Sequence, residues 1–222
     1  EVIFSYETNA IASKQLFVVD KEIISSEENP LSYFNLDESL TNSKSITDKK
    51  IDFGIGTLFD DDFIQPNYKN VNQFPQQTTL ALSIDNPSSS RGNVRDMSIE
   101  FRIFPGDNNI QFVCNPINIE ESSGEYKLAN PCDNNIADNR LSGSFIYQGI
   151  SYSQERESEF HKFSLIENTD ILSGDTFVGD INAVIDSSIL GVSEYQGIFV
   201  ESSAKYTFES SKTVSSSIRA SQ

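Results

Sequence analysis

Residues 160–208 alternate apolar and polar side chains in short runs that are separated by Gly, Asp and Ser. This period of two is typical of half-buried antiparallel strands, because successive side chains of a strand point to opposite faces. Similar runs recur along the rest of the chain. Their spacing predicts an all-β fold, an antiparallel β-barrel or β-sandwich of roughly 8–12 strands with long polar loops. The runs lie at residues 2–6, 16–20, 51–59, 78–85, 97–104, 110–114, 126–129, 143–152, 160–167, 176–186, 195–200 and 204–208.

The run at residues 97–104 shows the most regular alternation. We expect its apolar face, formed by Met97, Ile99, Phe101 and Ile103, to lie in the core. Ser98, Glu100 and Arg102 alternate with these residues and should face solvent or a polar surface.

The chain shows no clear linker, so we expect one all-β domain at residues 1–208. Residues 25–50 are rich in Ser, Glu, Asn and Lys and predict a long loop, with a helical turn around residues 36–40. Residues 209–222 form a Ser-rich segment that we expect to be a flexible tail.

The formal net charge of −17 argues against binding to nucleic acid or to anionic lipid, since both carry negative charge. It fits a soluble protein, a cation-rich environment or a basic partner. The sequence contains no apolar run of membrane-spanning length, so we expect no transmembrane segment. The first residue is Glu rather than Met, which removal of a targeting segment would explain, as would an edited sequence.

Cys114 and Cys132 flank a polar stretch, and a disulfide between them would close that loop. One such pair in a Ser/Asn-rich β protein fits an oxidising compartment, which favours a secreted or extracytoplasmic protein. Two free thiols are the alternative. The spacing of the pair and the single His argue against a zinc site.

Asp60, Asp61 and Asp62 end one of the predicted strands, and three carboxylates on a turn can bind Ca²⁺. A solvated turn without an ion is the alternative for these residues. His161 is the only histidine, but no neighbouring residues mark a catalytic triad. We therefore identify no catalytic residue and no cofactor motif other than the Ca²⁺ candidate.

Two groups of residues resemble motifs of the dirigent and allene oxide cyclase barrel superfamily. The first is a motif of the type F-G-x-x-x-x-F-D-D, matched by Phe53-Gly54 and Phe59-Asp60-Asp61. The second is a C-terminal series of an F-x-F strand, a G-x-I motif, a glycine-rich turn and a closing strand. The corresponding residues of this chain run in the same order, namely Phe160 and Phe163, Gly179-Asp180-Ile181, residues 191–199 and residues 205–208. The double glycine of the family's turn is absent.

The resemblance implies an eight-stranded barrel around an apolar cavity, in which a hydrophobic substrate is cyclised or coupled by confinement. The composition favours a different function, because motifs for a nucleophile or a cofactor are missing while Ser/Asn/Asp-rich loops are abundant. The leading hypothesis is a secreted or surface-exposed acidic protein that binds a small hydrophobic ligand or a partner protein. Edge strands that add to a neighbour's sheet would make it a subunit of an extracellular assembly or a homo-oligomer. The alternative is a cofactor-independent cyclase or isomerase.

Overall fold

The structure of the chain is a computed structural model. It describes residues 2–57, 62–68, 78–106, 109–113, 119–122, 125–128, 142–147, 150–156, 159–165 and 168–213, and side chains of residues 111–158 are not described. Strands dominate the described part, and their pairing is antiparallel except between the short strand β4 (Phe63–Ile64) and β1 (Val2–Val19).

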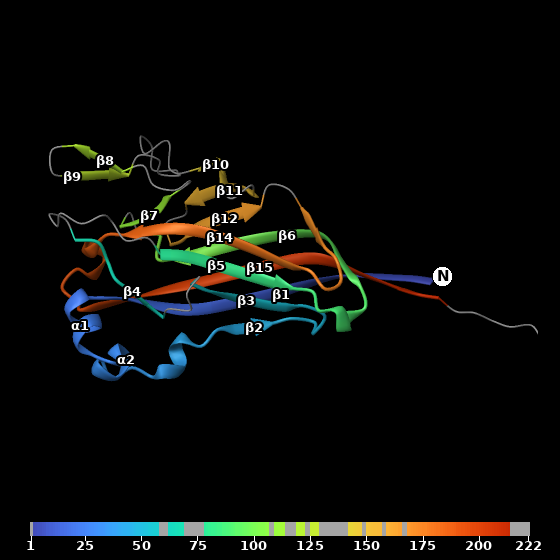
Figure 1. Cartoon of the computed structure of the whole chain (residues 1–222), viewed down its shortest axis with the longest axis horizontal. Helices are drawn as coiled ribbons and strands as arrows, with labels where there is room; N and C mark the ends of the chain where they lie inside the picture. Colours follow the sequence, from blue (N-terminus) through green and yellow to red (C-terminus); the bar gives the residue numbers. More distant parts are fainter. Residues whose placement is uncertain are drawn as a thin grey trace, which may run out of the picture.

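The larger sheet is built around three long strands that lie side by side, β6 (Asn93–Phe104), β15 (Tyr195–Lys212) and β1 (Figure 1). The chain's first strand and its last described strand pair along their whole lengths, from Val2 opposite Lys212 to Val19 opposite Tyr195. The spatial order is β10 (Ser142–Tyr147), β11 (Ile150–Arg156), β12 (His161–Leu165), β6 (Asn93–Phe104), β15 (Tyr195–Lys212), β1 (Val2–Val19) and β2 (Lys44–Ile46), with β13 (Thr169–Ile171) beside β6 and β4 (Phe63–Ile64) beside β1.

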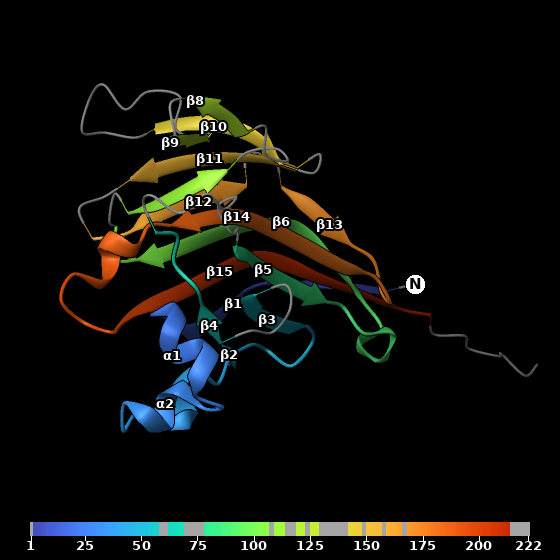
Figure 2. The same cartoon turned by 60° about the vertical axis from the view of Figure 1, so that its left-hand side comes forward.

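A second sheet packs against one face of the larger sheet (Figures 1 and 2). It contains β3 (Asp52–Thr57), β5 (Thr78–Asp85), β14 (Thr176–Ile185) and β7 (Ile110–Val113) in that spatial order. The hairpin of β8 (Ile119–Ser122) and β9 (Glu125–Leu128) stands apart. Among the described strands no pairing joins the two main sheets, so they form an open sandwich-like arrangement rather than a closed barrel. The predicted all-β antiparallel class is confirmed.

The core fills the space between the sheets and confirms the alternation predicted for residues 97–104. Phe101 is 2% exposed, and Met97, Ile99 and Ile103 are also buried. Glu100 and Arg102 lie on the opposite face of β6, where they form an ion pair with each other. Facing strands β5 and β14 supply Leu80, Leu82, Ile84, Ile181 and Ile185 to the same core.

A short helical segment covers the other face of β1 at its C-terminal end. Helices α1 (Lys21–Ser26) and α2 (Pro30–Tyr33) precede a 3₁₀ helix at Glu38–Thr41. Asp20 caps α1 by accepting a hydrogen bond from the N–H of Glu22 at 2.8 Å. Ile23 and Leu31 pack on Phe17 and Val19 of β1 and form a second, smaller core.

Several boundaries differ from the sequence prediction. The loop predicted at residues 25–50 contains α2, the 3₁₀ helix and β2, and its helical turn lies at Glu38–Thr41 rather than at 36–40. The runs at 2–6 and 16–20 belong to one strand, as do those at 195–200 and 204–208. β15 also continues to Lys212, into the segment predicted to be a flexible tail, because residues 209–212 pair with the start of β1. Within the described residues, no helix has the length and apolar character needed to cross a membrane.

Candidate functional site: an exposed two-stranded ribbon

The most distinctive surface feature is the end of the β1–β15 pair, which projects beyond the rest of the molecule (Figure 1). We call residues 2–9 of β1 and residues 205–212 of β15 the ribbon. The even-numbered residues of β1 face the second sheet, and Ala10, Ala12 and Leu16 are fully buried there. Toward the start of the strand this burial ends, because the second sheet no longer covers it.

Large apolar side chains occupy the uncovered part of β1 on both of its faces. Val2 is 47% exposed, Phe4 59% and Tyr6 43% on the face that continues the core, and Ile3 is 61% exposed on the opposite face. Single exposed apolar residues are common, but four within five residues form a patch, and such patches mark interaction surfaces.

The ribbon also has an unpaired edge within the described part of the chain. One edge of β1 pairs with β15, and the other is paired with β2 only at residues 11–13 and with β4 only at residues 17–18. Backbone N–H and C=O groups of residues 2–9 that point away from β15 therefore lack a described strand partner. Such an edge is a template for a further strand, and residues 2–9 contain neither Pro nor Lys, two residues that commonly protect edges.

Asp48 fixes the base of the ribbon to the loop that connects the two sheets. One oxygen, Oδ2, accepts a hydrogen bond from the Tyr6 hydroxyl at 2.8 Å, and Oδ1 accepts one from the Tyr206 hydroxyl at 2.9 Å. Tyr206 is 1% exposed. The centres of the neighbouring Phe208 and Tyr6 rings lie 5.8 Å apart. The Nζ atom of Lys50 lies 5.9 Å from the centre of the Phe208 ring.

This arrangement disfavours ionisation of both phenols. Burial, followed by the hydrogen bond and the negative charge of Asp48, raises the pKa of Tyr6 to about 12. The same causes raise the pKa of Tyr206 further, and the nearby Tyr6 adds to the effect. The tyrosines therefore act as hydrogen-bond donors at neutral pH and hold the ribbon in place.

We call the hydrogen bonds of Tyr6 and Tyr206 to Asp48 the clamp. We expect the clamp to make the stability of the folded protein sensitive to high pH. Because the folded-state pKa values are raised above the ordinary value of about 10, the stabilisation is fully present below pH 10 and is lost as pH rises toward the folded-state values. The free energy of unfolding, measured by urea titration at a series of pH values, should fall less steeply above pH 10 in Tyr206→Phe than in the wild type. Equal slopes would show that the clamp does not contribute.

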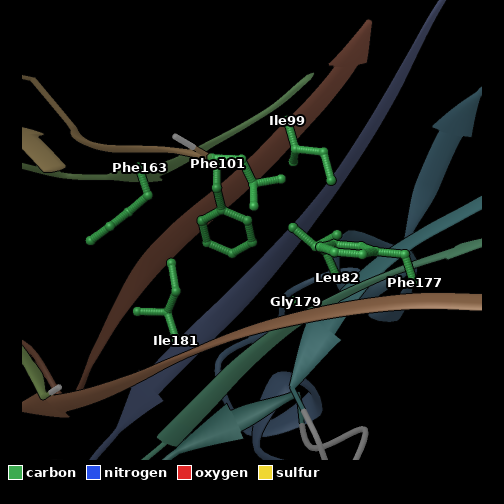
Figure 3. Close-up of a pocket in the computed structure, with 8 residues that line it drawn as sticks. Leu82, Ile99, Phe101, Phe163, Phe177, Gly179 and Ile181 are labelled. Atoms are coloured by element: carbon green, nitrogen blue, oxygen red, sulfur yellow. The ribbon is translucent and has the colours of Figure 1, made fainter. Parts of the chain in front are cut away.

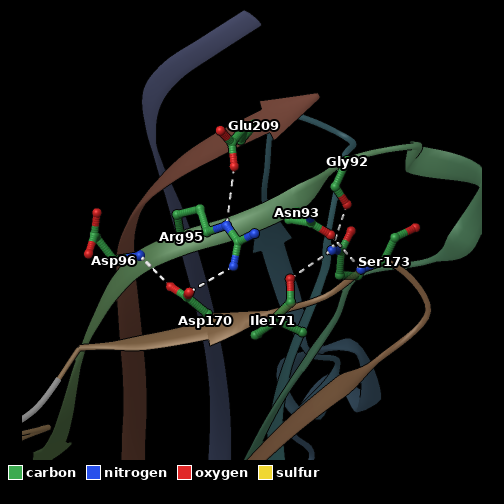
Figure 4. A network of polar contacts seen from close by, with 9 residues as sticks. Gly92, Asn93, Arg95, Asp96, Asp170, Ile171, Ser173 and Glu209 are labelled. Atoms are coloured by element: carbon green, nitrogen blue, oxygen red, sulfur yellow. Dashed lines mark hydrogen bonds and ion pairs between the residues drawn. The ribbon is translucent and has the colours of Figure 1, made fainter. Parts of the chain in front are cut away.

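A second network holds the other strand of the ribbon (Figure 4). The Arg95 guanidinium donates to Glu209 of β15 at 3.2 Å and to Asp170 of β13 at 2.8 Å. Asp170 also accepts from the N–H of Asp96 at 3.0 Å, and this backbone bond, followed by Arg95, lowers the pKa of Asp170. The ribbon is therefore anchored from both sides, which reduces the entropy that a binding partner would have to remove.

Asn86 is fully buried and bridges Gly92 and Ile171, two residues that Figure 4 labels beside this network. Its side-chain amide donates to the carbonyl oxygens of Gly92 at 3.0 Å and Ile171 at 3.1 Å, which joins the loop before β6 to β13. An adjacent open groove of about 300 Å³ is lined by Arg91, Glu209 and the exposed Ile3, among other residues.

Between the described parts of the two sheets, the cavity beside Phe101 offers little room for a ligand. Phe101, Phe163 and Phe177 point into it from both sheets, as Figure 3 shows. The remaining cavity is about 10 Å³, enough for about one water molecule. It is lined by Leu82, Ile99, Phe101, Phe163, Leu165, Phe177, Gly179 and Ile181.

The residues of the predicted acidic turn are only partly described, since Asp60 and Asp61 lie outside the described residues. Asp62 forms an ion pair with Lys14 of β1 at 2.8 Å, and the Lys14 side chain is 6% exposed. This lysine offsets one charge of the turn. Asp62 also borders an open polar groove of about 720 Å³, together with Glu28 and Glu38. Among the described residues no group of three His, Cys, Asp or Glu side chains is placed to hold a metal ion, and the Ca²⁺ site stays a prediction.

The remaining predicted residues do not gather with the ribbon. Cys114 and Cys132 lie outside the described residues, so the disulfide stays a prediction. His161 is 1% exposed and lies on β12 opposite Ile103, on the core side of the sheet. Its surroundings are those of a core residue rather than of an open cleft.

The sequence predicts residues 2–6 as a strand, but it does not predict that their apolar side chains are exposed to solvent. Their apolar content is the same signal that a buried strand gives. Tyr206 and Asp48 were also missed, because residues from a predicted loop and a predicted strand meet only in the folded chain. No protein-family model matches this chain, and no curated protein sequence matches it significantly.

Proposed function

We propose that this protein is a secreted or surface-exposed acidic β protein that acts by binding a partner protein through its ribbon. The observation that carries the proposal is the combination, in residues 2–9, of an unpaired strand edge and exposed apolar side chains. An extended segment of a partner can add to such an edge through backbone hydrogen bonds, while side-chain contacts give specificity.

The anchoring of the ribbon supports this binding mode. Strand addition is most favourable when the receiving edge is already extended, since no ordering cost is then added to association. The hydrogen bonds of Asp48 to two tyrosines and the contacts of Arg95 with Glu209 keep the ribbon in that conformation. The groove lined by Ile3 also includes the exposed residue Arg91, and an arginine there can pair with a carboxylate of the partner.

Within the described core, the small cavity beside Phe101 favours a partner protein over an enclosed small ligand. Ligand pockets usually measure about 300–1,000 Å³, whereas the cavity between the described sheets is about 10 Å³. The alternative function, a cyclase or isomerase of the allene oxide cyclase or dirigent type, needs a cavity that encloses its substrate. The filled space around Phe101 and Phe163 therefore gives that alternative no support within the described core.

The proposal predicts that extended peptides bind at residues 2–9. A displayed library of random peptides, selected on the protein, should yield binders that slow amide hydrogen exchange in these residues. Phe4→Lys should weaken them by about tenfold or more, because it replaces the most apolar contact with a residue that protects natural edges. Val192→Lys is the matched control, since it adds the same charge at a fully exposed apolar residue. Binders that protect other segments and ignore Phe4→Lys would contradict the proposal.

A further inference from the structure

The ribbon carries almost none of the charge that characterises the rest of the molecule. It contains two acidic residues, Glu7 and Glu209, and two basic residues, Lys205 and Lys212, in a chain whose net charge is −17. Glu7 and Lys205 lie 3.8 Å apart, and Glu209 contacts Arg95. Two copies of so acidic a protein repel each other over most of their surfaces. The ribbon is a neutral, apolar place where they can approach.

We infer that the ribbon's partner is a second copy of this chain, joined to the first by antiparallel pairing of the two β1 edges across a two-fold axis. The inference rests on the proposed function and names the partner. An edge strand that pairs with its own copy in the antiparallel direction forms an isologous interface, the commonest kind in soluble dimers. The two larger sheets would then continue into one another.

The side chains of residues 2–8 select one register for this pairing. In one register Ser5 of one copy lies opposite Ser5 of the other. Two pairs of Phe4 with Tyr6 then form between the copies, one on each side of the two-fold axis. Cross-strand aromatic pairs of this kind stabilise antiparallel sheets. In the same register Glu7 faces Ile3 of the second copy, so that no two carboxylates lie opposite each other.

Pairing of the two β1 edges places the exposed even-numbered residues of both copies on one face, beyond the end of the second sheet. Val2, Phe4 and Tyr6 all lie on this face, and they are 47%, 59% and 43% exposed. The clamp at Asp48 holds the Tyr6 ring against Phe208, so the aromatic partner for Phe4 of the second copy is already positioned.

The test measures molar mass by light scattering during size exclusion over a range of concentrations. The wild-type chain should move from 24.8 kDa toward twice that mass as concentration rises. Phe4→Lys should raise the dissociation constant of the dimer by about tenfold or more, and Val192→Lys should leave it unchanged. Circular dichroism of Phe4→Lys should show a wild-type spectrum, which separates loss of pairing from loss of folding.

The register is tested by disulfide crosslinking. Under mild oxidation Ser5→Cys should form a covalent dimer that the wild type does not, since this residue lies at the two-fold axis. Ser211→Cys is the matched control, because Ser211 is an exposed serine of the ribbon on β15, away from the free edge of β1. It should stay monomeric in a denaturing gel.

Each outcome separates this inference from the proposed function. A wild type that stays monomeric at all concentrations, or a dimer that Phe4→Lys does not weaken, overturns self-pairing. If the monomer still binds extended peptides at residues 2–9, the partner is a strand of another protein and the proposed function stands. A dimer that forms without Ser5→Cys crosslinking overturns the two-fold register.

Discussion

Replacing Phe101 with Ala should lower the free energy of unfolding by about 3–5 kcal/mol. The ring is 2% exposed in the centre of β6 and contacts the second sheet across the core. Its removal deletes buried apolar area and leaves a void, because strands held in two paired sheets can close only part of it. The void would join the small cavity that Phe101 already borders.

Urea unfolding followed by fluorescence or circular dichroism measures this effect. Ser98→Ala on the same strand is the matched control, since Ser98 lies on the exposed face and its loss should change stability by less than about 0.5 kcal/mol. A loss below about 1 kcal/mol for Phe101→Ala would mean that the two sheets do not pack as closely as described.

Replacing Gly92 with Ala should also destabilise the fold, by about 1–3 kcal/mol or more. A Cβ atom on this residue would lie 2.6 Å from the carbonyl oxygen of Glu209 and would collide with the ring of Phe208. The backbone of β15 cannot yield without disturbing its pairing with β6, in which Glu209 lies opposite Asn93. Overpacking at this point therefore strains the base of the ribbon.

Gly56→Ala provides the comparison for Gly92→Ala. The nearest atoms to a Cβ on Gly56 belong to the Lys14 side chain at 3.7 Å, an ordinary contact distance. Both substitutions restrict the unfolded chain equally, so the difference between their unfolding free energies reports the collision at Gly92. Equal stabilities of the two variants would contradict the close approach of the loop before β6 to β15.

The parts of the fold that the sequence predicts best are those where a strand buries one face completely. Residues 97–104 alternate because one side of β6 faces the core and the other faces solvent, so the pattern records the packing directly. The length of β1 could not be predicted in the same way. Its middle contains Ala10 and Ala12, which are buried but too small to give a strong apolar signal.

The candidate site depends on information that alternation does not contain. Val2, Phe4 and Tyr6 have the pattern of a buried strand, and only the extent of the facing sheet decides that they are exposed. Whether an edge is free depends on which strands pair, and the pairing partner of Val2 is Lys212 at the other end of the described chain. Residues 209–212 belong to a Ser-rich segment that the composition predicted to be a flexible tail. Their strand conformation depends on pairing with β1, and composition does not show that pairing.

The pairing of β1 with β15 has a consequence for how the chain folds. β1 is synthesised before the other described strands, but its principal partner β15 is completed only after them. Contacts between residues so distant in sequence close slowly, because a long loop must lose its freedom before they form. During that interval the segment Val-Ile-Phe-Ser-Tyr is exposed on both edges, so we expect it to need protection from aggregation.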